Sequence, residues 1–538
     1  MRRLTLAFAL LLALPALGMG PWPSVERQLA EDRVPPGSAL ERLIESHQDF
    51  QVLRPGEAAD GLPLPPWLRV FWRKAHPQGR YTEADAAGGY PLILKEIHEW
   101  METHPDLLPG RPEPDVVPRQ KAASESANTR VSGVAPNPRS ESDIRVDFRN
   151  PQRIIAASNN ISGSGLQMQY YSFDGGLTWG RTTLPLVPGD AFHTDPTVDW
   201  TSDGTAWATT IGVTTGGHTR IRAYRSRDGG ATWTFDGTVS GDQKSVDKQQ
   251  VWVDHSASSP WRDTLYAIWH NGGPVYVSRR RPGGGWERPV PVSAEQPGTG
   301  IGADVKTNAA GVVFGLWPNT RTRNVQVVRS TDGGRTFSAP APVATTLDAF
   351  DIGIPAQSRR RVLIYVSAGA WRAASQELVY AAWTDLNAAG CKTGRSAPPA
   401  RACKTRIWFT RSTDGGRTWE PARKVNDQRS VNDQFNQALA VDEATGTIGL
   451  VYYDTADDPG RRKVHLWYQS STDHGVTWTT PRQVTTAATD ESARGSEYGN
   501  QFGDYNGLSG FGGVFFPSWT DRRDNGREEI WTAPVKEE

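Results

Sequence analysis

Carboxyl and phenol side chains occur in this sequence in positions that could support acid–base or nucleophilic chemistry. Asp504 and Tyr505 are adjacent, and Asp195 opens a similar segment earlier in the chain. A carboxyl group can donate or accept a proton, and a phenol beside a base can act as a nucleophile. We therefore select Asp504, Tyr505 and Asp195 as candidate catalytic residues.

A second set of residues could hold a polar or charged ligand. Arg321 and the adjacent pair Arg522 and Arg523 carry guanidinium groups, which bind carboxylates through two parallel hydrogen bonds. Asp247 and Asp433 offer acceptor oxygens. These five residues are the candidate substrate-binding set.

The elements that position these residues belong to a repeat array. Five segments share the pattern Ser-x-Asp-x-Gly-x-Thr-aromatic, centred on Asp174, Asp228, Asp332, Asp414 and Asp473, and a decayed sixth copy covers residues 278–286. The copies recur about every 50–60 residues, with one longer interval. Each Asp favours a tight turn by accepting nearby backbone N–H groups, and the aromatic residue then packs against the sheet.

These segments resemble Asp boxes, the BNR repeats of sialidase-like β-propellers, over about residues 140–538. The resemblance implies an all-β fold of four-stranded blades around a central channel. Asp boxes also occur in propellers that are not sialidases. The first blade reads Arg149-Asn150-Pro151 where sialidases carry Arg-Ile-Pro.

Seven blades are expected, starting near residues 143, 195, 247, 304, 351, 433 and 504. The last unit ends without a fourth strand, and residues 130–134 could supply it by pairing the two ends of the array. Six blades is the alternative, because six boxes are visible.

The topology of a propeller predicts which face carries the candidate residues. The innermost strands begin, and the second strands end, on the face opposite the Asp boxes. Asp195, Asp247, Asp433 and Asp504 should therefore surround the channel, with the three arginines in an outer ring. An insertion over residues 386–404 should overhang this face.

The acidic ring has three interpretations. Glycoside cleavage needs two acid, base or nucleophilic groups, one of which is a Tyr in sialidases. Several carboxylates around one axis would also suit Ca²⁺, although nothing in the pattern requires a cofactor. In the third interpretation, each Asp only binds neighbouring backbone, which its recurrence in nearly every repeat favours.

Two functions follow from the resemblance. One is an exo-glycosidase of sialidase type that acts on a glycan or glycoconjugate at the channel. The alternative is a non-catalytic propeller that binds a glycan or a protein partner. The sequence leaves open whether the protein is an enzyme.

The composition excludes other classes. The 59 basic and 59 acidic residues give zero formal net charge, so a general nucleic-acid binder is not expected. Two cysteines cannot form a disulfide scaffold, but Cys391 and Cys403 could close one loop.

The N-terminus has the pattern of a secretory signal over residues 1–20, with a short basic start and an apolar run too short to span a membrane. A helical region (21–108), a linker (109–128) and the propeller (129–538) should follow. We expect a monomer that is secreted or periplasmic and has no transmembrane segment.

Overall fold

The computed structural model describes residues 120–537, apart from residues 122–127, 135–136, 162–164, 294–299, 349, 374–375, 390, 392–402, 429, 494, 498–499 and 524–525. The predicted signal, helical region and most of the predicted linker lie outside the described residues. Within these described ranges no helix could cross a membrane.

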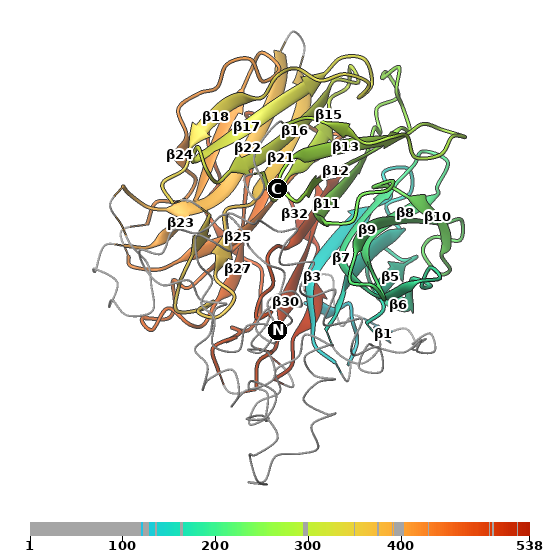
Figure 1. Ribbon diagram of the computed structural model, residues 1–538. Helices are drawn as coiled ribbons and strands as arrows, with labels where there is room; N and C mark the ends of the chain where they lie inside the picture. Colours follow the sequence, from blue (N-terminus) through green and yellow to red (C-terminus); the bar gives the residue numbers. More distant parts are fainter. Residues whose placement is uncertain are drawn as a thin grey trace, which may run out of the picture.

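Seven antiparallel sheets surround a central axis, and each is a blade of the propeller (Figure 1). The first four blades, written from the innermost strand outward, are β3 (Arg139–Val146), β4 (Ile154–Asn160), β5 (Met168–Ser172) and β6 (Thr178–Thr183); β7 (Asp190–Trp200), β8 (Ala206–Thr214), β9 (Thr219–Ser226) and β10 (Thr234–Thr238); β11 (Val246–Val253), β12 (Leu265–Asn271), β13 (Val275–Arg280) and β14 (Val290–Pro291); β15 (Asp304–Thr307), β16 (Val313–Asn319), β17 (Asn324–Ser330) and β18 (Ala341–Thr345).

The last three blades follow the same order. They are β21 (Val366–Ala373), β22 (Gln376–Leu386), β23 (Thr405–Ser412) and β24 (Arg423–Lys424); β25 (Gln434–Val441), β26 (Ile448–Asp454), β27 (His465–Ser471) and β28 (Arg482–Gln483); β29 (Gly507–Phe511), β30 (Val514–Asp521), β31 (Glu529–Thr532) and β2 (Thr129–Arg130), with β32 (Val535–Lys536) also paired to β30. The predicted seven-bladed, all-β propeller is confirmed.

The ring is closed by the N-terminal side of the propeller, as the sequence predicted. β2 pairs with β31, with Thr129 opposite Thr532 and Arg130 opposite Trp531. Slightly upstream, β1 (Gln120–Lys121) pairs with β6 on the outer edge of the first blade. In Figure 1, β3 and β30 lie side by side where the first and last blades meet. β2 and β1 therefore pair with the last and the first blade, respectively, where the ring closes.

One predicted blade start is wrong. Asp351 does not open the fifth blade, which begins at Val366. Asp351 lies instead in β19 (Asp351–Ile352), which pairs with β20 (Val362–Leu363) to form a two-stranded sheet between the fourth and fifth blades. The predicted insertion after Leu386 does separate the second and third strands of the fifth blade.

The Asp boxes form identical self-contained turns. In the box of Asp332, the Ser330 hydroxyl donates to Oδ1, while the backbone N–H and hydroxyl of Thr336 donate to Oδ1 and Oδ2 at 2.9 and 2.6 Å. The same three contacts recur at the other four complete boxes, Asp174, Asp228, Asp414 and Asp473. These carboxylates therefore stabilise their own turns.

Other aspartates on the innermost strands join neighbouring blades. Asp143 accepts the backbone N–H of Val198 at 2.9 Å, and Asp199 accepts that of Val253 at 2.7 Å. Asp304 binds the N–H of Ala368 in the same way. For these three residues the structure supports the interpretation that a strand Asp holds adjacent backbone. The Oδ1 atom of each Asp also accepts the backbone N–H of the next residue in its own strand.

Candidate functional site

The innermost strands of four blades are interrupted by a bulge near the channel mouth. The register shifts between Ser140 and Asp143, Thr194 and Thr197, Asp247 and Gln250, and Phe435 and Ala438. Each bulge contains one non-glycine residue in the left-handed region, and these are Glu141 (φ 56°), Asp195 (φ 55°), Lys248 (φ 47°) and Asn436 (φ 50°). Such a backbone is uncommon for non-glycine residues, although Asp and Asn adopt it more readily than other types, and it recurs at functional sites.

A buried ion-pair cluster lies at this mouth. Arg360 donates to both oxygens of Asp504, at 2.7 Å from Nε to Oδ1 and 2.5 Å from Nη2 to Oδ2, and its Nη2 also reaches Glu141 Oε1 at 2.8 Å. Asn159 donates to the other Glu141 oxygen. Glu141 and Arg360 are each 1% exposed and Asp504 9%. Three chain regions that are distant in sequence therefore meet at one polar centre.

Two tyrosines and a lysine complete the mouth. The Lys248 ammonium lies 3.3 Å from the centroid of the Tyr505 ring and 5.5 Å from that of Tyr365. A cation over an aromatic face is stabilised by the ring quadrupole. The Tyr365 hydroxyl donates to Asp504 at 3.5 Å, whereas the Tyr505 hydroxyl is buried without a hydrogen-bond partner in the described part of the chain. Tyr505 thus offers an uncommitted hydroxyl.

A cavity continues from the mouth into the channel. Side chains from six of the seven blades line it, among them Asp143, Arg145, Lys248, Asp304, Lys306, Tyr365, Ser367, Asn436, Asp504 and Tyr505. Deeper in the cavity, the cations are matched by carboxylates: Lys306 Nζ is 2.5 Å from Asp304, and Arg145 Nη1 is 3.8 Å from Asp143. The strand bulges, the Arg360 ion-pair cluster and the two tyrosines therefore lie at the channel mouth rather than in the deeper part of the cavity.

Two carboxyl groups at the mouth, Glu141 and Asp195, have raised pKa values. Burial raises the pKa of Glu141 well above its usual value, Arg360 opposes this shift, and the negative charges of Asp504 and Asp195 reinforce it. Burial also raises the pKa of Asp195 against the opposing charge of Lys248. Carboxyl groups in such surroundings hold a proton at higher pH and can serve as general acids.

The two tyrosines are held in their neutral form. Burial raises the pKa of Tyr505 well above the usual value, and the charges of Asp195 and Glu141 add to the shift. Burial and Asp504 act on Tyr365 in the same direction. Either phenol would have to lose its proton to a neighbouring carboxylate during attack.

The structure brings the three candidate catalytic residues together. Asp504 and Tyr505 precede β29, and Asp195 lies in the β7 bulge, where its backbone N–H donates to Asn159 and its carbonyl accepts from Gln249. Asp247 starts the β11 bulge beside them, and its Oδ1 accepts the Lys248 N–H at 2.9 Å. Their charges act on one another and on Tyr365.

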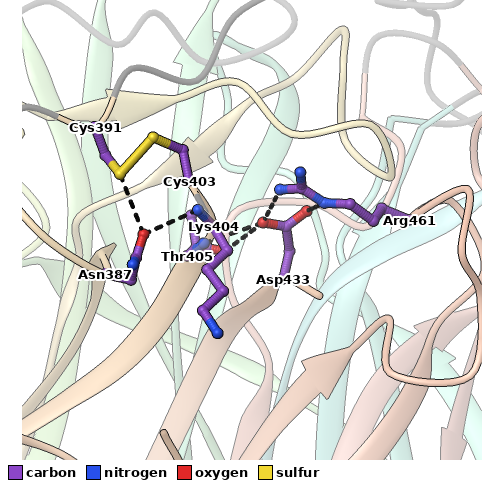
Figure 2. Close-up of a disulfide and its surroundings, with 7 residues drawn as sticks. All are labelled: Asn387, Cys391, Cys403, Lys404, Thr405, Asp433 and Arg461. Atoms are coloured by element: carbon purple, nitrogen blue, oxygen red, sulfur yellow. Dashed lines mark hydrogen bonds and ion pairs between the residues drawn. A yellow bond between two sulfur atoms is a disulfide. The ribbon is translucent and has the colours of Figure 1, made fainter. Parts of the chain in front are cut away.

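Asp433 lies elsewhere and has a structural partner. Arg461 donates to both of its oxygens, at 2.7 and 2.5 Å, and the backbone N–H of Thr405 donates to Oδ1 at 3.0 Å (Figure 2). Asp433 is fully buried and does not line the cavity. It ties the fifth blade to the loop that precedes the sixth.

The three candidate arginines do not line the cavity either. Arg321 is exposed in the loop after β16. Arg522 donates to the backbone carbonyls of Asp490, Ala493 and Gly526. Arg523 forms an ion pair with Asp521 and lies over Trp531. Their placement fits loop stabilisation, and Arg360 is the arginine that reaches the mouth.

Cys391 and Cys403 form a disulfide at the base of the insertion in the fifth blade (Figure 2). Their Cα atoms are 5.3 Å apart, within the usual range for a disulfide. Asn387, between β22 and Cys391, accepts the backbone N–H of Lys404 at 3.0 Å. The two ends of the insertion are therefore fixed to each other next to Asp433.

A second charged centre lies at the opposite end of the channel. His255, in the third blade, binds Asp199 through Nε2 at 3.0 Å and Glu443 of the sixth blade through Nδ1 at 2.8 Å. Burial lowers its pKa, but Asp199 and Glu443 outweigh this and hold the pKa well above the usual value. The protonated ring thus bridges two blades across the channel.

No metal centre emerges from these groups. In the described ranges, no set of three or more His, Cys, Asp or Glu side chains is arranged to hold a metal ion. The Ca²⁺ option raised by the acidic ring stays a prediction.

The comparisons with known proteins agree with the repeat. Residues 393–493 match the model of a BNR repeat-like domain. The match lies within the seven-bladed propeller and includes two of its Asp-box turns, those of Asp414 and Asp473. No curated protein matches the chain.

Solved structures that are similar include both enzymes and a lectin. The α-L-arabinofuranosidase Arb93A from Fusarium graminearum is 13% identical, with a TM-score of 0.41 over 63% of this chain and 92% of that chain. The intramolecular trans-sialidase from Ruminococcus gnavus is 13% identical, with a TM-score of 0.39 over 77% and 97%. The BP39L lectin from Burkholderia pseudomallei is 11% identical, with a TM-score of 0.41 over 64% and 84%.

The residues that sequence reasoning missed are those whose position depends on irregular backbone. Glu141 lies two residues before the Asp that marks the first repeat, inside a bulge. Arg360 and Tyr365 belong to the insertion that was taken for a blade start. His255 follows β11 and carries no motif. Lys248 was not missed, because it adjoins Asp247 at a repeat position and is expected beside the channel for that reason.

Proposed function

We propose that this protein is an exported glycoside hydrolase whose catalytic site is the channel mouth of the propeller. The supporting observation is that Glu141, Arg360, Tyr365 and Tyr505, which have no counterparts in the other repeats, gather around two repeat-position aspartates, Asp195 and Asp504. A catalytic group needs to occur once, so this single combination is the best candidate for the site.

The residues suggest a division of roles. Asp195, whose pKa burial raises, acts as the general acid toward the leaving group. Tyr505 acts as the nucleophile: its oxygen bonds to the anomeric carbon as the bond to the leaving group breaks, and its proton passes to Glu141. The leaving oxygen takes the proton of Asp195. Asp504 supplies negative charge to a cationic transition state when Arg360 no longer binds it. The sialidase-type exo-glycosidase remains one form of this proposal.

Export is supported by two observations. The sequence of residues 1–20 has the pattern of a secretory signal, and the Cys391–Cys403 disulfide suits an oxidising compartment. The destination would be the periplasm or the medium, and the expected partner is a glycan or glycoconjugate.

A non-catalytic glycan- or protein-binding propeller is the second candidate. It is favoured by the burial of the cluster, since Glu141 and Asp504 are nearly inaccessible as they stand. A binder would instead use the loops around the mouth.

A panel of chromogenic glycosides, a sialoside included, separates the two functions. We expect Tyr505→Phe and Asp504→Asn to lower kcat/KM by at least ~100-fold on the best substrate. Tyr380→Phe is the control for Tyr505, because among the described residues its hydroxyl is also buried without a hydrogen-bond partner, but it lies in the core around β22. Asp433→Asn is the control for Asp504, because both bind an arginine through two oxygens.

The controls should keep activity within about threefold in samples that circular dichroism shows to be folded. No turnover of any glycoside by the wild type would eliminate the hydrolase. Equal losses in the controls would show that the mouth is not the site.

A further inference from the structure

The segment between β19 and β20 crosses the channel mouth. It leaves the junction of the fourth and fifth blades and reaches the seventh and first, where Arg360 contacts Asp504 and Glu141. Residues 353–361 are called the strap below. Because Glu141 and Asp504 are almost completely buried, a ligand cannot reach them while Arg360 remains bound.

The strap is attached to the far side of the mouth by side-chain contacts rather than by strand pairing. Gln357 Nε2 donates to the Gly503 carbonyl at 3.1 Å. Gln501 Oε1 accepts the backbone N–H groups of both Arg359 and Arg360 at 3.0 Å. These hydrogen bonds and one ion-pair centre hold this end, while Ile354 and Ala356, nearer the base, are buried in the hydrophobic core. Attachments through side chains open at lower cost than a paired strand.

The base of the strap is held separately. β19 and β20 pair, and Arg361 forms an ion pair with Asp351 at 3.3 Å, so the two ends of the strap stay together. Arg361 itself adopts φ 67°, a left-handed conformation, immediately after Arg360. A strained non-glycine residue between a fixed base and a separable tip is a suitable hinge position.

We propose that the strap is a movable cover of the channel mouth, latched by Arg360 to Asp504 and Glu141, and that it must open before a ligand enters. The inference rests on the proposed function, because that function makes the channel mouth the place where a ligand binds. The opening itself can be measured without any substrate.

A thiol in the cavity provides the measurement. Ala303 lines the cavity and is 4% exposed, so Ala303→Cys places a reporter below the mouth. It would be the single free thiol, because the chain has only two cysteines and both are in the disulfide. The reagent is methyl methanethiosulfonate, which is small and uncharged, and the readout is the labelling rate by mass spectrometry.

In the reporter background, Arg360→Ala should raise the labelling rate by at least ~10-fold, because the latch is lost. Arg461→Ala is the matched control, since it removes an equally buried arginine from Asp433 away from the cavity. It should leave the rate unchanged. Equal rates with and without Arg360, or equal acceleration by the control, would overturn the proposal.

Arg360→Ala leaves buried carboxylates unpaired and could impair folding. Gln357→Ala therefore serves as a second variant, because it removes the hydrogen bonds from Gln357 to Gly503 and to the Arg361 carbonyl without changing any charge. A rise of about 3-fold is expected in folded protein, and an unchanged rate would contradict the strap.

The two proposals fail separately. Faster labelling with no glycoside turned over would retain the strap and remove the hydrolase. Glycoside turnover with unchanged labelling would retain the hydrolase and remove the strap.

Discussion

The two faces of the propeller use acidic residues in opposite ways. On the Asp-box face, each box aspartate is bound by the Ser and Thr of its own turn, and the same contacts recur in five blades. At the channel mouth, Glu141, Asp195 and Asp504 are buried against charges from other blades. The box aspartates, bound within their own turns, therefore build the fold, whereas the candidate site gathers acidic residues that act on one another across blades.

The protonation of the acids shows the same contrast. Partial burial acts to raise the pKa of Asp332, but hydrogen bonds from Thr336 and Ser330 lower it to about 2. At the mouth, burial is the larger influence, and the pKa values of Glu141 and Asp195 are raised. Carboxyl groups thus act as ionised hydrogen-bond acceptors on the Asp-box face and as candidate proton donors at the channel mouth.

The largest expected effect concerns Asp433 and tests whether it stabilises the fold rather than serving the candidate site. Asp433→Asn would leave Arg461 buried without its full ion pair, and we expect a loss of about 3–5 kcal/mol in the free energy of unfolding. Urea denaturation followed by fluorescence and circular dichroism measures it. A loss below 1 kcal/mol would mean that the pair contributes little to the fold.

An intermediate effect is expected at the lower end of the channel. The folded-state pKa of His255 is raised, so its ion pairs stabilise the fold fully below the unfolded value of about 6.5. This stability is lost as the pH rises through the folded-state pKa. Glu443→Gln should remove about 1–3 kcal/mol at pH 6 and flatten the decline toward alkaline pH.

Urea denaturation across this pH range provides the test, with Glu420→Gln as the control because Glu420 pairs with Arg411 at the surface. That control should change stability by less than about 1 kcal/mol at any pH. A Glu443→Gln curve parallel to that of the wild type would contradict the assigned role of His255.

The sequence predicts the regular parts of this molecule well. Box turns, blade period and ring closure through residues near 130 all depend on local chemistry or on pairing the two ends of an array. Asp504, Tyr505 and Asp195 lie close together because every innermost strand of the propeller begins at the same end of the channel. This part of the site needs no knowledge of the loops.

The rest of the site depends on irregular backbone. Glu141 faces the mouth because of a left-handed bulge, which has no residue signature when the residue is not glycine. Arg360 lies in an insertion between the fourth and fifth blades, and Asp351 of this insertion resembles the Asp that opens a blade. Arg522 and Arg523 have the right chemistry but bind loop carbonyls and Asp521, contacts that only the folded loops determine.

The smallest effect tests the repeated side of the comparison. Asp332→Ala removes the acceptor of four hydrogen bonds within one exposed turn, and about 1 kcal/mol of stability should be lost. Asp473→Ala in a distant blade should cost a similar amount, and the double variant should lose about the sum of the two, because self-contained turns do not share partners. Substitutions at the mouth should instead be strongly non-additive, because Glu141 and Asp504 share Arg360. Non-additive losses in the two boxes would show that the turns are coupled through the ring, and the distinction between local and shared aspartates would then fail.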